Sequence, residues 1–404
     1  MHDVLIIGGG LVGNSLACAL AREGLRVGLV EATAGGPAAG DAPPAFDERN
    51  LALAEASLNA LGALGVLARL RSPPAPIRRI HVSRRGDFGA VRLDAREQGR
   101  EAFGGVVIAR ELGAALEAAV GALPTVERIR PMRMVALAQG PGSVDVRLDG
   151  PEGERRLQAR LLVAADGTES GVRAQAGIDV DRHDYGQTLF VSSVAPARAP
   201  DGQAFERFTD TGPIALLPRP DGHFGGVMGV DREAAGAVAA LSDEAYLEHF
   251  AARFGGRAGR LLRVGRRQAY PIQRVVARQL VAGRVVVVGN AAQTLHPIGA
   301  QGFNLGLRDA LTLAEVVAAG RADPGHAEVL AAYPRRRRDD REATLSFSDG
   351  LARLTANEGF GPHLLRSLGL LALQRWPGLK ARLAAGAMGY RGDVPALSRG
   401  EPGR

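Results

Sequence analysis

The sequence has few of the residues on which several classes of protein depend. Cys18 is the only cysteine among 404 residues, which excludes a disulfide framework and any CxxC metal site and fits a reducing compartment. Aromatic residues make up 4% of the chain, too few for a surface that stacks on nucleic-acid bases. We find no run of about 18 apolar residues, so we expect no membrane-spanning helix.

The net charge of +7 does not indicate a nucleic-acid partner. Lys380 is the only lysine, and the arginines are spread along the chain, which indicates a compositional bias rather than a binding face. One cluster, residues 335–338, is followed at once by Asp339 and Asp340, and we expect it to form the solvated face of a helix. Contact with anionic lipid or a partner is the alternative. We expect a cytoplasmic protein, or one bound peripherally to the inner membrane.

Apolar periodicity predicts an α/β fold. Residues 4–7 form a short apolar run, 16–22 have helical spacing, and 25–31 form a second apolar run. This strand–helix–strand order predicts a parallel sheet with helices on its faces. Further helices are expected over residues 51–70 and 110–123.

The rest of the chain divides into three patterns. Residues 144–148 and 156–164 predict a hairpin, and the valine run at 284–288 predicts another buried parallel strand. Short alternating runs between 186 and 273 predict an antiparallel sheet with one helix over 242–254. From 305 to about 389 the pattern is helical. The first domain is therefore interrupted by an inserted one.

Gly8, Gly10 and Gly13 form the motif G-x-G-x-x-G between the first strand and the first helix. The first glycine permits a tight turn, the second lets a pyrophosphate approach the backbone, and the third lets the helix pack on the strand. Glu31 ends the second strand, where a carboxylate accepts hydrogen bonds from a ribose diol. This pattern predicts a dinucleotide with an unphosphorylated ribose, FAD or NAD.

Two further motifs follow in order. Residues 163–167, with Ser170 and Arg173, resemble the Asp-Gly motif of the class A aromatic-ring flavoprotein monooxygenases, and residues 288–309 resemble their second FAD fingerprint. Within that group, residues 185–187, 206–209, 212–218 and 340–344 resemble the ubiquinone-biosynthesis hydroxylases. The resemblance implies FAD as the cofactor, NAD(P)H as the reductant, and hydroxylation of a polyprenylated phenol by O2 through a flavin C4a-hydroperoxide.

The resemblance also implies the architecture of p-hydroxybenzoate hydroxylase. We expect a discontinuous, Rossmann-like FAD-binding domain made of residues 1–72, 100–182 and 273–345. An antiparallel substrate-binding sheet domain would comprise residues 73–99 and 183–272. Residues 346–404 would form a helical C-terminal region.

The family pattern assigns the cofactor contacts to thirteen residues: Gly8, Gly10, Gly13, Glu31, Arg49, Arg110, Asp166, Asn290, Gly299, Ala300, Gly302, Phe303 and Asn304. Backbone amides near Gly302 begin a helix and would direct positive charge at the reduced flavin. The two arginines suit a diphosphate, with a surface salt bridge as the alternative. Asn290 stands where the wider family has aspartate, and the order Gly299-Ala300 is inverted relative to the quinone-pathway enzymes.

The substrate side is less constrained. A phenol needs orientation and, from a base, removal of its proton. The candidates for catalysis are Tyr185, His296 and Pro297, with a purely structural histidine as the alternative. The candidates for contacts with the substrate, against ordinary core packing as the alternative, are Gln187, Phe208, Leu217, Pro218 and Met228.

The C-terminal helices carry an apolar face at helical spacing with basic residues around it: Leu364, Leu365, Leu368 and Leu371, with Arg366, Arg375 and Lys380. This face would meet membrane lipid, other enzymes of the ubiquinone pathway, or the body of the protein. The functional alternatives are hydroxylation of another ring position, hydroxylation of a small phenol, and an FAD-binding scaffold subunit without turnover. A flavin-dependent halogenase is disfavoured because Trp376 is the only tryptophan.

Overall fold

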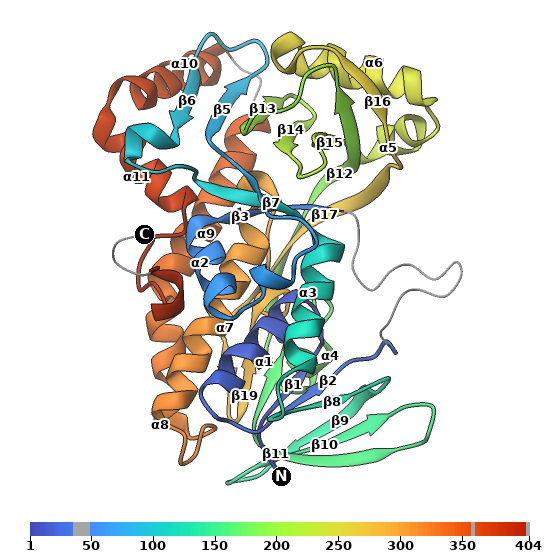
Figure 1. Cartoon of the computed structure of the whole chain (residues 1–404), viewed down its shortest axis with the longest axis vertical. Helices are drawn as coiled ribbons and strands as arrows, with labels where there is room; N and C mark the ends of the chain where they lie inside the picture. The colour runs from blue at the N-terminus through green and yellow to red at the C-terminus, as the bar shows by residue number, and fades with distance from the viewer. Residues whose placement is uncertain (35–48, 357–359, 401–404) are drawn as a thin grey trace.

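The computed structural model describes residues 1–34, 49–356 and 360–400. Its lower half in Figure 1 contains a mixed sheet. The strands described for this sheet are β1 (His2–Ile7), β2 (Val27–Val30), β8 (Val126–Ile129), β9 (Arg133–Gln139), β10 (Val144–Asp149), β11 (Arg155–Ala164), β18 (Val281–Ala282) and β19 (Val285–Val287).

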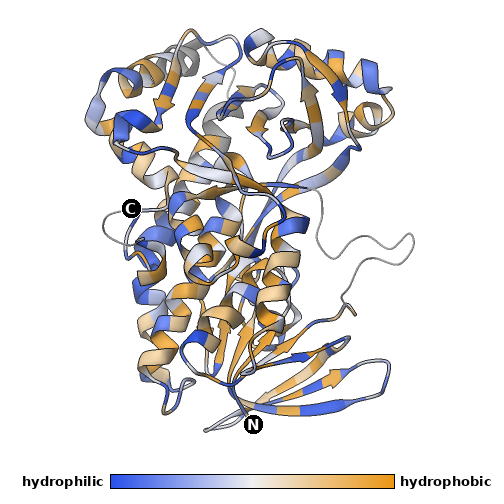
Figure 2. Ribbon diagram, in the orientation of Figure 1, coloured by the Kyte–Doolittle hydropathy of each residue, from blue (hydrophilic) through white to orange (hydrophobic). Residues whose placement is uncertain are grey.

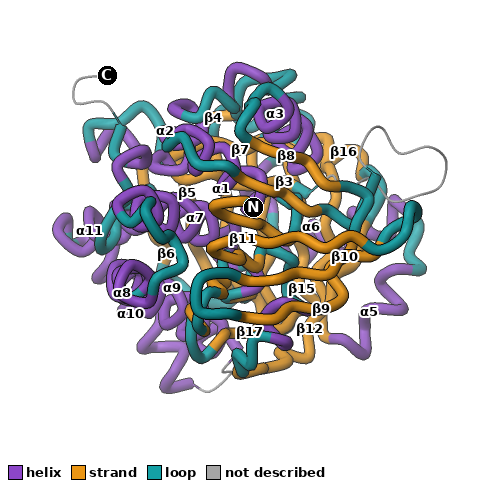
Figure 3. The backbone as a smooth tube through the Cα atoms, turned by 90° about the horizontal axis from the view of Figure 1, so that it is seen from below, coloured by secondary structure: helices purple, strands orange, loops and turns teal. Residues whose placement is uncertain are grey.

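The centre of this sheet is parallel, in the order β19-β11-β1-β2-β8, and β10 joins β11 as the predicted antiparallel hairpin. Seen from below in Figure 3, β9, β10 and β11 run side by side across the end of the molecule. The central strands are hydrophobic along their length (Figure 2), because helices together with residues of β9 and β10 pack against them in one buried core.

Three helices enclose the core of this half: α1 (Leu11–Arg22), α3 (Ala109–Gly121) and α7 (Gln301–Ala319). α1 packs against both of the others. Gly306 of α7 permits the closest approach, since a Cβ there would lie 2.9 Å from Val12 and 3.0 Å from the Cα of Gly289. α7 therefore lies directly against the glycine turn.

A second sheet forms the upper half. Its described strands are β5 (Arg79–Arg84), β6 (Ala90–Asp94), β12 (Val180–Pro196), β13 (Gln203–Thr209), β14 (Gly212–Pro218), β15 (Phe224–Asp231), β16 (Leu261–Val264), β17 (Gln268–Ala277) and β20 (Gln293–Thr294). It is antiparallel apart from the β13–β5 pair, and one face packs on α6 (Asp243–Phe254). Its long strands β12 and β17 extend towards the lower half (Figure 1).

Between the halves lies a small sheet of β3 (Asn50–Ala54), β4 (Ala75–Pro76) and β7 (Gly104–Ile108). This sheet corrects the expected helix over 51–70: residues 50–54 pair with β7, and α2 (Glu55–Ala63) begins only afterwards. The cause is tertiary, because the backbone of Ala52 and Ala54 also bonds to the side chain of Asn304 on α7.

The remaining described helices are α4 (Gly171–Gln175), α5 (Arg232–Ala239), α8 (Ala327–Leu330), α9 (Ala332–Ala356), α10 (Phe360–Arg375) and α11 (Pro377–Ala387). α9 packs along α7, and α10 packs on β6. Among the described residues, no helix is both long and apolar enough to cross a membrane. The chain is an α/β protein with the helical C-terminal region that the sequence predicts.

The expected solvated face at residues 335–338 is only half correct. Arg335 and Arg338 are exposed, but Arg337 and Asp340 are fully buried. Arg337 donates to Asp340 at 2.6 Å, and Arg308 of α7 donates to the same carboxylate at 2.7 Å. Burial opposes ionisation of Asp340, but the two guanidinium groups hold its pKa below the usual value.

Candidate functional site

The turn between β1 and α1 is built from glycines for three different reasons. Gly8 has a φ of +110°, and a Cβ there would lie 2.3 Å from the carbonyl oxygen of Ala165. At Gly13 a Cβ would lie 1.9 Å from the carbonyl oxygen of Gly8, so glycine lets α1 begin beside the strand. Gly10 faces open space in a cavity, where nothing lies within 4 Å of an added Cβ.

The start of α1 is left open to an anion. Gly10 is its N-cap, so no side chain caps the first amides, and no acidic residue occupies the first turn. The amides and the helix dipole therefore point positive charge into the space beside Gly10, which suits a pyrophosphate.

Glu31, directly after β2, supports this turn. Its carboxylate accepts the N–H of Gly9 at 2.7 Å and, through the other oxygen, the N–H of Thr33 at 2.9 Å. The side chain is half-buried, and a carboxylate keeps further lone pairs for ribose hydroxyls. Sequence spacing alone does not reveal the first of these tasks, which is to hold the glycine backbone in place.

The Asp-Gly motif braces the cavity from beneath. Asp166 accepts hydrogen bonds from the hydroxyl of Ser170, the N-cap of α4, and, at 3.1 Å, from the Val172 N–H, so its side chain holds the first turn of α4. It is absent from the lining of the cavity among the described residues, whereas its neighbours Gly167 and Thr168 are present. The side chain of Asp166 thus holds the segment whose backbone faces the cavity.

Two contacts join this motif to the second fingerprint. Arg173 donates to the carbonyl of Ala291 at 2.9 Å, and the hydroxyls of Thr168 and Thr294 lie 2.8 Å apart. Asn290, just before Ala291 in the chain, is exposed and lines the cavity. An amide at this position donates and accepts hydrogen bonds without adding a charge near a pyrophosphate.

Residues 297–304, which we call the flavin loop, cross the cavity and lead into α7. Gly299 and Ala300 adopt consecutive left-handed conformations, with φ of +70° and +51°. For alanine this costs about 1–2 kcal/mol, so the loop needs support from outside. Asn304 supplies that support: its amide nitrogen donates to the carbonyl of Ala300 at 2.9 Å, and it is 2% exposed.

The first turn of α7 has no side-chain cap and no acidic residue. Gly302 and Phe303 lie in this turn and line the cavity, and an added Cβ at Gly302 would meet nothing within 4 Å. The amides are therefore open to a flat ring, and the helix start favours negative charge on it.

The two predicted arginines occupy different places. Arg49 lines the cavity, with its guanidinium carbon 5.1 Å from the centre of the Tyr270 ring. Arg110 is exposed in the first turn of α3, and only its neighbour Ala109 is among the described lining residues. The structure thus brings Arg49, and not Arg110, to the cavity.

All of these segments surround one cavity of ≈ 710 Å³. Its lower part is bounded by the glycine turn, Asn290 and the flavin loop, and its upper part by strands of the second sheet. A flavin dinucleotide fits the lower part. The backbone at Gly10 is open, and the first turns of α1 and α7 have no side-chain cap, which suits an anionic, flat ligand. Gly10, Arg49, Asn290 and the flavin loop would hold it.

The predicted catalytic histidine is not among the described lining residues. The N–H of Ile298 donates to Nδ1 of His296, so Nε2 carries the proton and donates to Gln187 at 3.1 Å. The His296 ring packs edge-on against Tyr185, and Tyr185 donates to Asp349 at 3.2 Å. Burial lowers the pKa of His296 to about 4.

In this arrangement three of the predicted residues contact protein groups rather than the cavity. Because His296, Tyr185 and Gln187 bond to one another or to protein groups, they form a support behind Pro297, the one predicted catalytic residue that does line the cavity. Ser348 of α9 adds to it by donating to the carbonyl of His296 at 3.1 Å. The histidine fixes the entry to the flavin loop as a neutral group.

The second sheet shows why three of the predicted wall residues lie outside the described lining of the cavity. Met228 pairs with Ile214, and both face α6, whereas their neighbours Val227 and Ala215 face the cavity. Both faces of the sheet are apolar, so alternation in the sequence does not tell them apart. Phe208 pairs with the start of β14 and Pro218 ends that strand, and both lie outside the described lining. Leu217 is the one predicted wall residue that faces the cavity.

The sequence analysis missed several wall residues: Leu189, Val191, Glu206, Pro213, Ala215 and Val227. All but one are apolar. Only the register of the four paired strands shows which of these side chains face the cavity, and a single sequence does not reveal that register.

Comparisons with known proteins agree with this geometry. A family model described as FAD binding domain matches residues 1–348. The chain is 36% identical to ubiquinone hydroxylase UbiL of Rhodospirillum rubrum, over 99% of this chain and 93% of that protein. It is 32% identical to 3-demethoxyubiquinol 3-hydroxylase of Escherichia coli K12, over 96% and 98%.

Among solved structures, the chain resembles p-nitrophenol 4-monooxygenase PnpA from Pseudomonas putida DLL-E4. The TM-score is 0.79 at 21% sequence identity, covering 97% of this chain and 98% of that one. At this identity the likeness concerns the fold alone.

Substitutions in the glycine turn separate folding from cofactor binding. We expect Gly8→Ala to lose both, because its Cβ would meet the backbone of Ala165 at 2.3 Å. Gly10→Ala should keep the melting temperature of the cofactor-free protein but bind FAD at least about tenfold more weakly, a loss of about 1.4 kcal/mol. Thermal unfolding and fluorescence titration with FAD measure the two effects. Equal damage by both substitutions would contradict the assignment of Gly10 to the cradle.

The buried histidine predicts a dependence of stability on pH. His296 stays neutral in the folded protein down to about pH 4, whereas in the unfolded chain it takes up a proton near the ordinary histidine pKa of 6.5. Stability is therefore lost as pH falls from 6.5 towards 4, by about 2–3 kcal/mol from this residue. The free energy of unfolding of His296→Gln should lack this part of the decline. If the free energies of unfolding of the two proteins declined in parallel with pH, this role of His296 would be refuted.

Proposed function

Since the chain belongs to the FAD-dependent hydroxylases of ubiquinone biosynthesis, the family that its motifs predicted, we propose that it hydroxylates the aromatic ring of a polyprenylated phenol. It is an FAD-dependent aromatic-ring monooxygenase. The observation that supports this substrate most directly is a cavity of ≈ 710 Å³, in which the cofactor cradle and the apolar sheet face adjoin.

FAD, when bound, accepts electrons from NAD(P)H and activates O2. The protein's own contribution is electrostatic and steric. The open start of α7 stabilises negative charge on a ring held against the flavin loop. Leu189, Val191 and Val227 keep water away from the reacting atoms.

The walls suit an aromatic ring. Ala215 and Leu217 of β14 and Val227 of β15 present aliphatic side chains on one surface, and Pro297 begins the loop opposite. Such walls offer a methoxylated phenol apolar contact area but few hydrogen bonds. One or two polar contacts must therefore set the orientation of its ring.

We expect the purified protein with FAD, NAD(P)H and ¹⁸O2 to convert a prenylated methoxyphenol into a product that carries one ¹⁸O atom. Mass spectrometry identifies the product, and NMR of the product identifies the ring carbon that gained oxygen. Gly10→Ala serves as the control with little bound FAD. A protein that binds FAD but hydroxylates neither a prenylated nor a small phenol would favour the scaffold alternative. Turnover of the small phenol alone would overturn the prenylated substrate.

We further propose that the exposed apolar surface of α10 and α11 contacts the bilayer surface. This apolar patch consists of Phe88, Leu368, Leu371, Trp376 and Leu379, which are between 39% and 67% exposed. The loop of Phe88 lies against α10, since a Cβ at the adjoining Gly89 would lie 2.5 Å from the carbonyl oxygen of Ser367.

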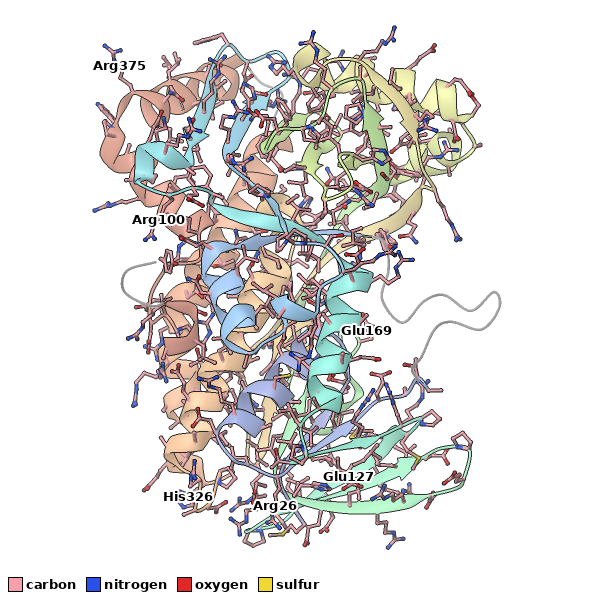
Figure 4. The ribbon with its side chains drawn as sticks, in the orientation of Figure 1. Arg26, Arg100, Glu127, Glu169, His326 and Arg375 are labelled. Carbon is pink, nitrogen blue, oxygen red and sulfur yellow. The ribbon has the colours of Figure 1, made fainter. Side chains whose placement is uncertain are left out.

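Charge near the patch supports a lipid rather than a purely apolar partner. Arg375 projects outward from the end of α10 (Figure 4), and Trp376 beside it is of the residue type that favours membrane interfaces. Lys380, expected to be part of this surface, instead lies buried and pairs with Glu97. Leu364, Leu365 and Arg366 lie outside the residues whose side chains the structure describes.

Sedimentation with vesicles of phosphatidylcholine and phosphatidylglycerol tests the patch. We expect Leu371→Ser with Trp376→Ser to weaken binding by about tenfold, because two apolar side chains no longer enter the interface. Val135→Ser, on β9 at the other end of the molecule, is the matched control, since Val135 is also exposed, at 37%. Unchanged sedimentation of the double variant would leave the patch to a protein partner.

A further inference from the structure

Glu206 is the one acidic side chain among the described residues that line the cavity. It lies in the middle of β13, paired with Ala215 of β14 on one side and with Val82 of β5 on the other. Ala215 and Leu217 face the cavity from β14, and the pleat places Glu206 on the same face. The carboxyl group is therefore on the wall that a substrate ring would touch.

No hydrogen bond or ion pair of Glu206 is found among the described residues. The buried carboxylates of Asp309 and Asp340, in contrast, each accept a hydrogen bond from a guanidinium group. The Glu206 side chain is half-buried, and it lines the cavity. Burial alone raises its pKa to about 8.

The opposite charges on the elements around Glu206 are paired elsewhere: on β5, Arg79 pairs with Asp201 and Arg84 with Asp210. β14 has no titratable residue. On β5, His81 is next to Val82, the residue that pairs with Glu206, so the alternation of the strand points His81 to the other face. Arg207 donates to Ser83 at 3.4 Å, also away from the cavity face.

Helix α9 and the cavity itself are the remaining surroundings of Glu206. α9 packs against β13 and β14, and Asp349, its last charged residue with a described side chain, accepts the hydrogen bond of Tyr185. Inside the cavity, the other titratable lining residues are Arg49 and Tyr270, which contact each other. Nothing described thus compensates the Glu206 carboxylate.

An unpaired carboxyl in an apolar wall lowers stability unless a ligand satisfies it. Resting on the proposed function, we propose that Glu206 binds the phenolic hydroxyl of the substrate and removes its proton. The O–H bond of the phenol breaks, a new O–H bond forms on the carboxylate, and the electron pair stays on the phenol oxygen. The negative charge moves from the carboxylate to the ring, which becomes more reactive towards an electrophilic oxygen.

The match of acidities favours this transfer. A phenol has a pKa of about 10, and an exposed glutamate one of about 4.3. The cavity brings the pKa of Glu206 to about 8, which narrows the gap between acid and base from more than five units to about two. A base so placed works best when ionised, so hydroxylation should speed up as pH rises towards 8 and level off above it.

The central experiment compares the wild-type holoenzyme with Glu206→Gln, Glu206→Asp and the exposed control Glu233→Gln on α5. We expect Glu206→Gln to form product at least about 100-fold more slowly, to lose the rise with pH, and to release the electrons of NAD(P)H as hydrogen peroxide. Glu206→Asp should regain part of the rate and the rise with pH. Wild-type rates and pH profile in Glu206→Gln would overturn the proposal.

A binding measurement without turnover separates this proposal from the proposed function. With oxidised protein, we expect wild type to bind a prenylated methoxyphenol at least about tenfold more tightly than the methyl ether that lacks its hydroxyl. Glu206→Leu, which leaves no hydrogen-bond acceptor, should bind the two alike. The ratio supports the contact with Glu206 even if no product forms in any assay. An equal ratio in both proteins, with normal hydroxylation, would refute the contact and leave the function standing.

Stability supplies a third readout that a structural role would not give. The folded protein holds Glu206 protonated up to about pH 8, whereas the unfolded chain ionises it near 4.5. Glu206 therefore destabilises the fold as pH rises from 4.5 towards 8. Glu206→Gln should melt at a higher temperature than wild type at pH 8 and at about the same temperature at pH 4.5. A lower melting temperature at pH 8 would show that the side chain serves the fold and would contradict the proposal.

Discussion

The flavin loop depends on one buried amide, the side chain of Asn304. Its oxygen accepts the N–H of Ala54 at 2.9 Å and the hydroxyl of Ser57 at 2.7 Å, and its nitrogen donates to the carbonyls of Ala52 and Ala300. These bonds use all four positions that an amide offers. They tie the first turn of α7 to β3 and hold Ala300 in its left-handed conformation, so the cofactor cradle and the small central sheet form one unit.

The rest of α7 is fixed by buried charge. Arg308 binds Asp340, and Asp309 binds Arg337, so two pairs join α7 to α9 where no water reaches them. Asp309 also accepts a hydrogen bond from Gln293, just before the flavin loop. Removing one partner of such a pair costs about 3–5 kcal/mol, because the other charge stays buried. The position of the loop thus rests on polar contacts that burial makes costly to break.

Predictions succeeded where a residue type has a single physical reason. Close backbone approaches require glycine at positions 8 and 13, and the spacing of the two glycines predicts the strand–turn–helix fold around them. They failed where the reason lies in another part of the chain. Met228 and Val227 are equally apolar, and only the pairing of β15 with β14 tells which faces the cavity. The same holds for Arg337, whose burial depends on a carboxylate that α7 supplies, and for residues 50–54, whose strand depends on β7.

Asn304 thus positions the cofactor through the flavin loop. The dissociation constant of FAD, measured for Asn304→Ala and for Asn59→Ala, tests this most directly. Asn59 of α2 is also an amide that donates to protein groups, but it lies outside the described lining of the cavity. Our account predicts that the first substitution weakens FAD binding by about tenfold or more, while the second leaves it near the wild-type value. Equal affinities for the two variants, in folded proteins, would contradict it.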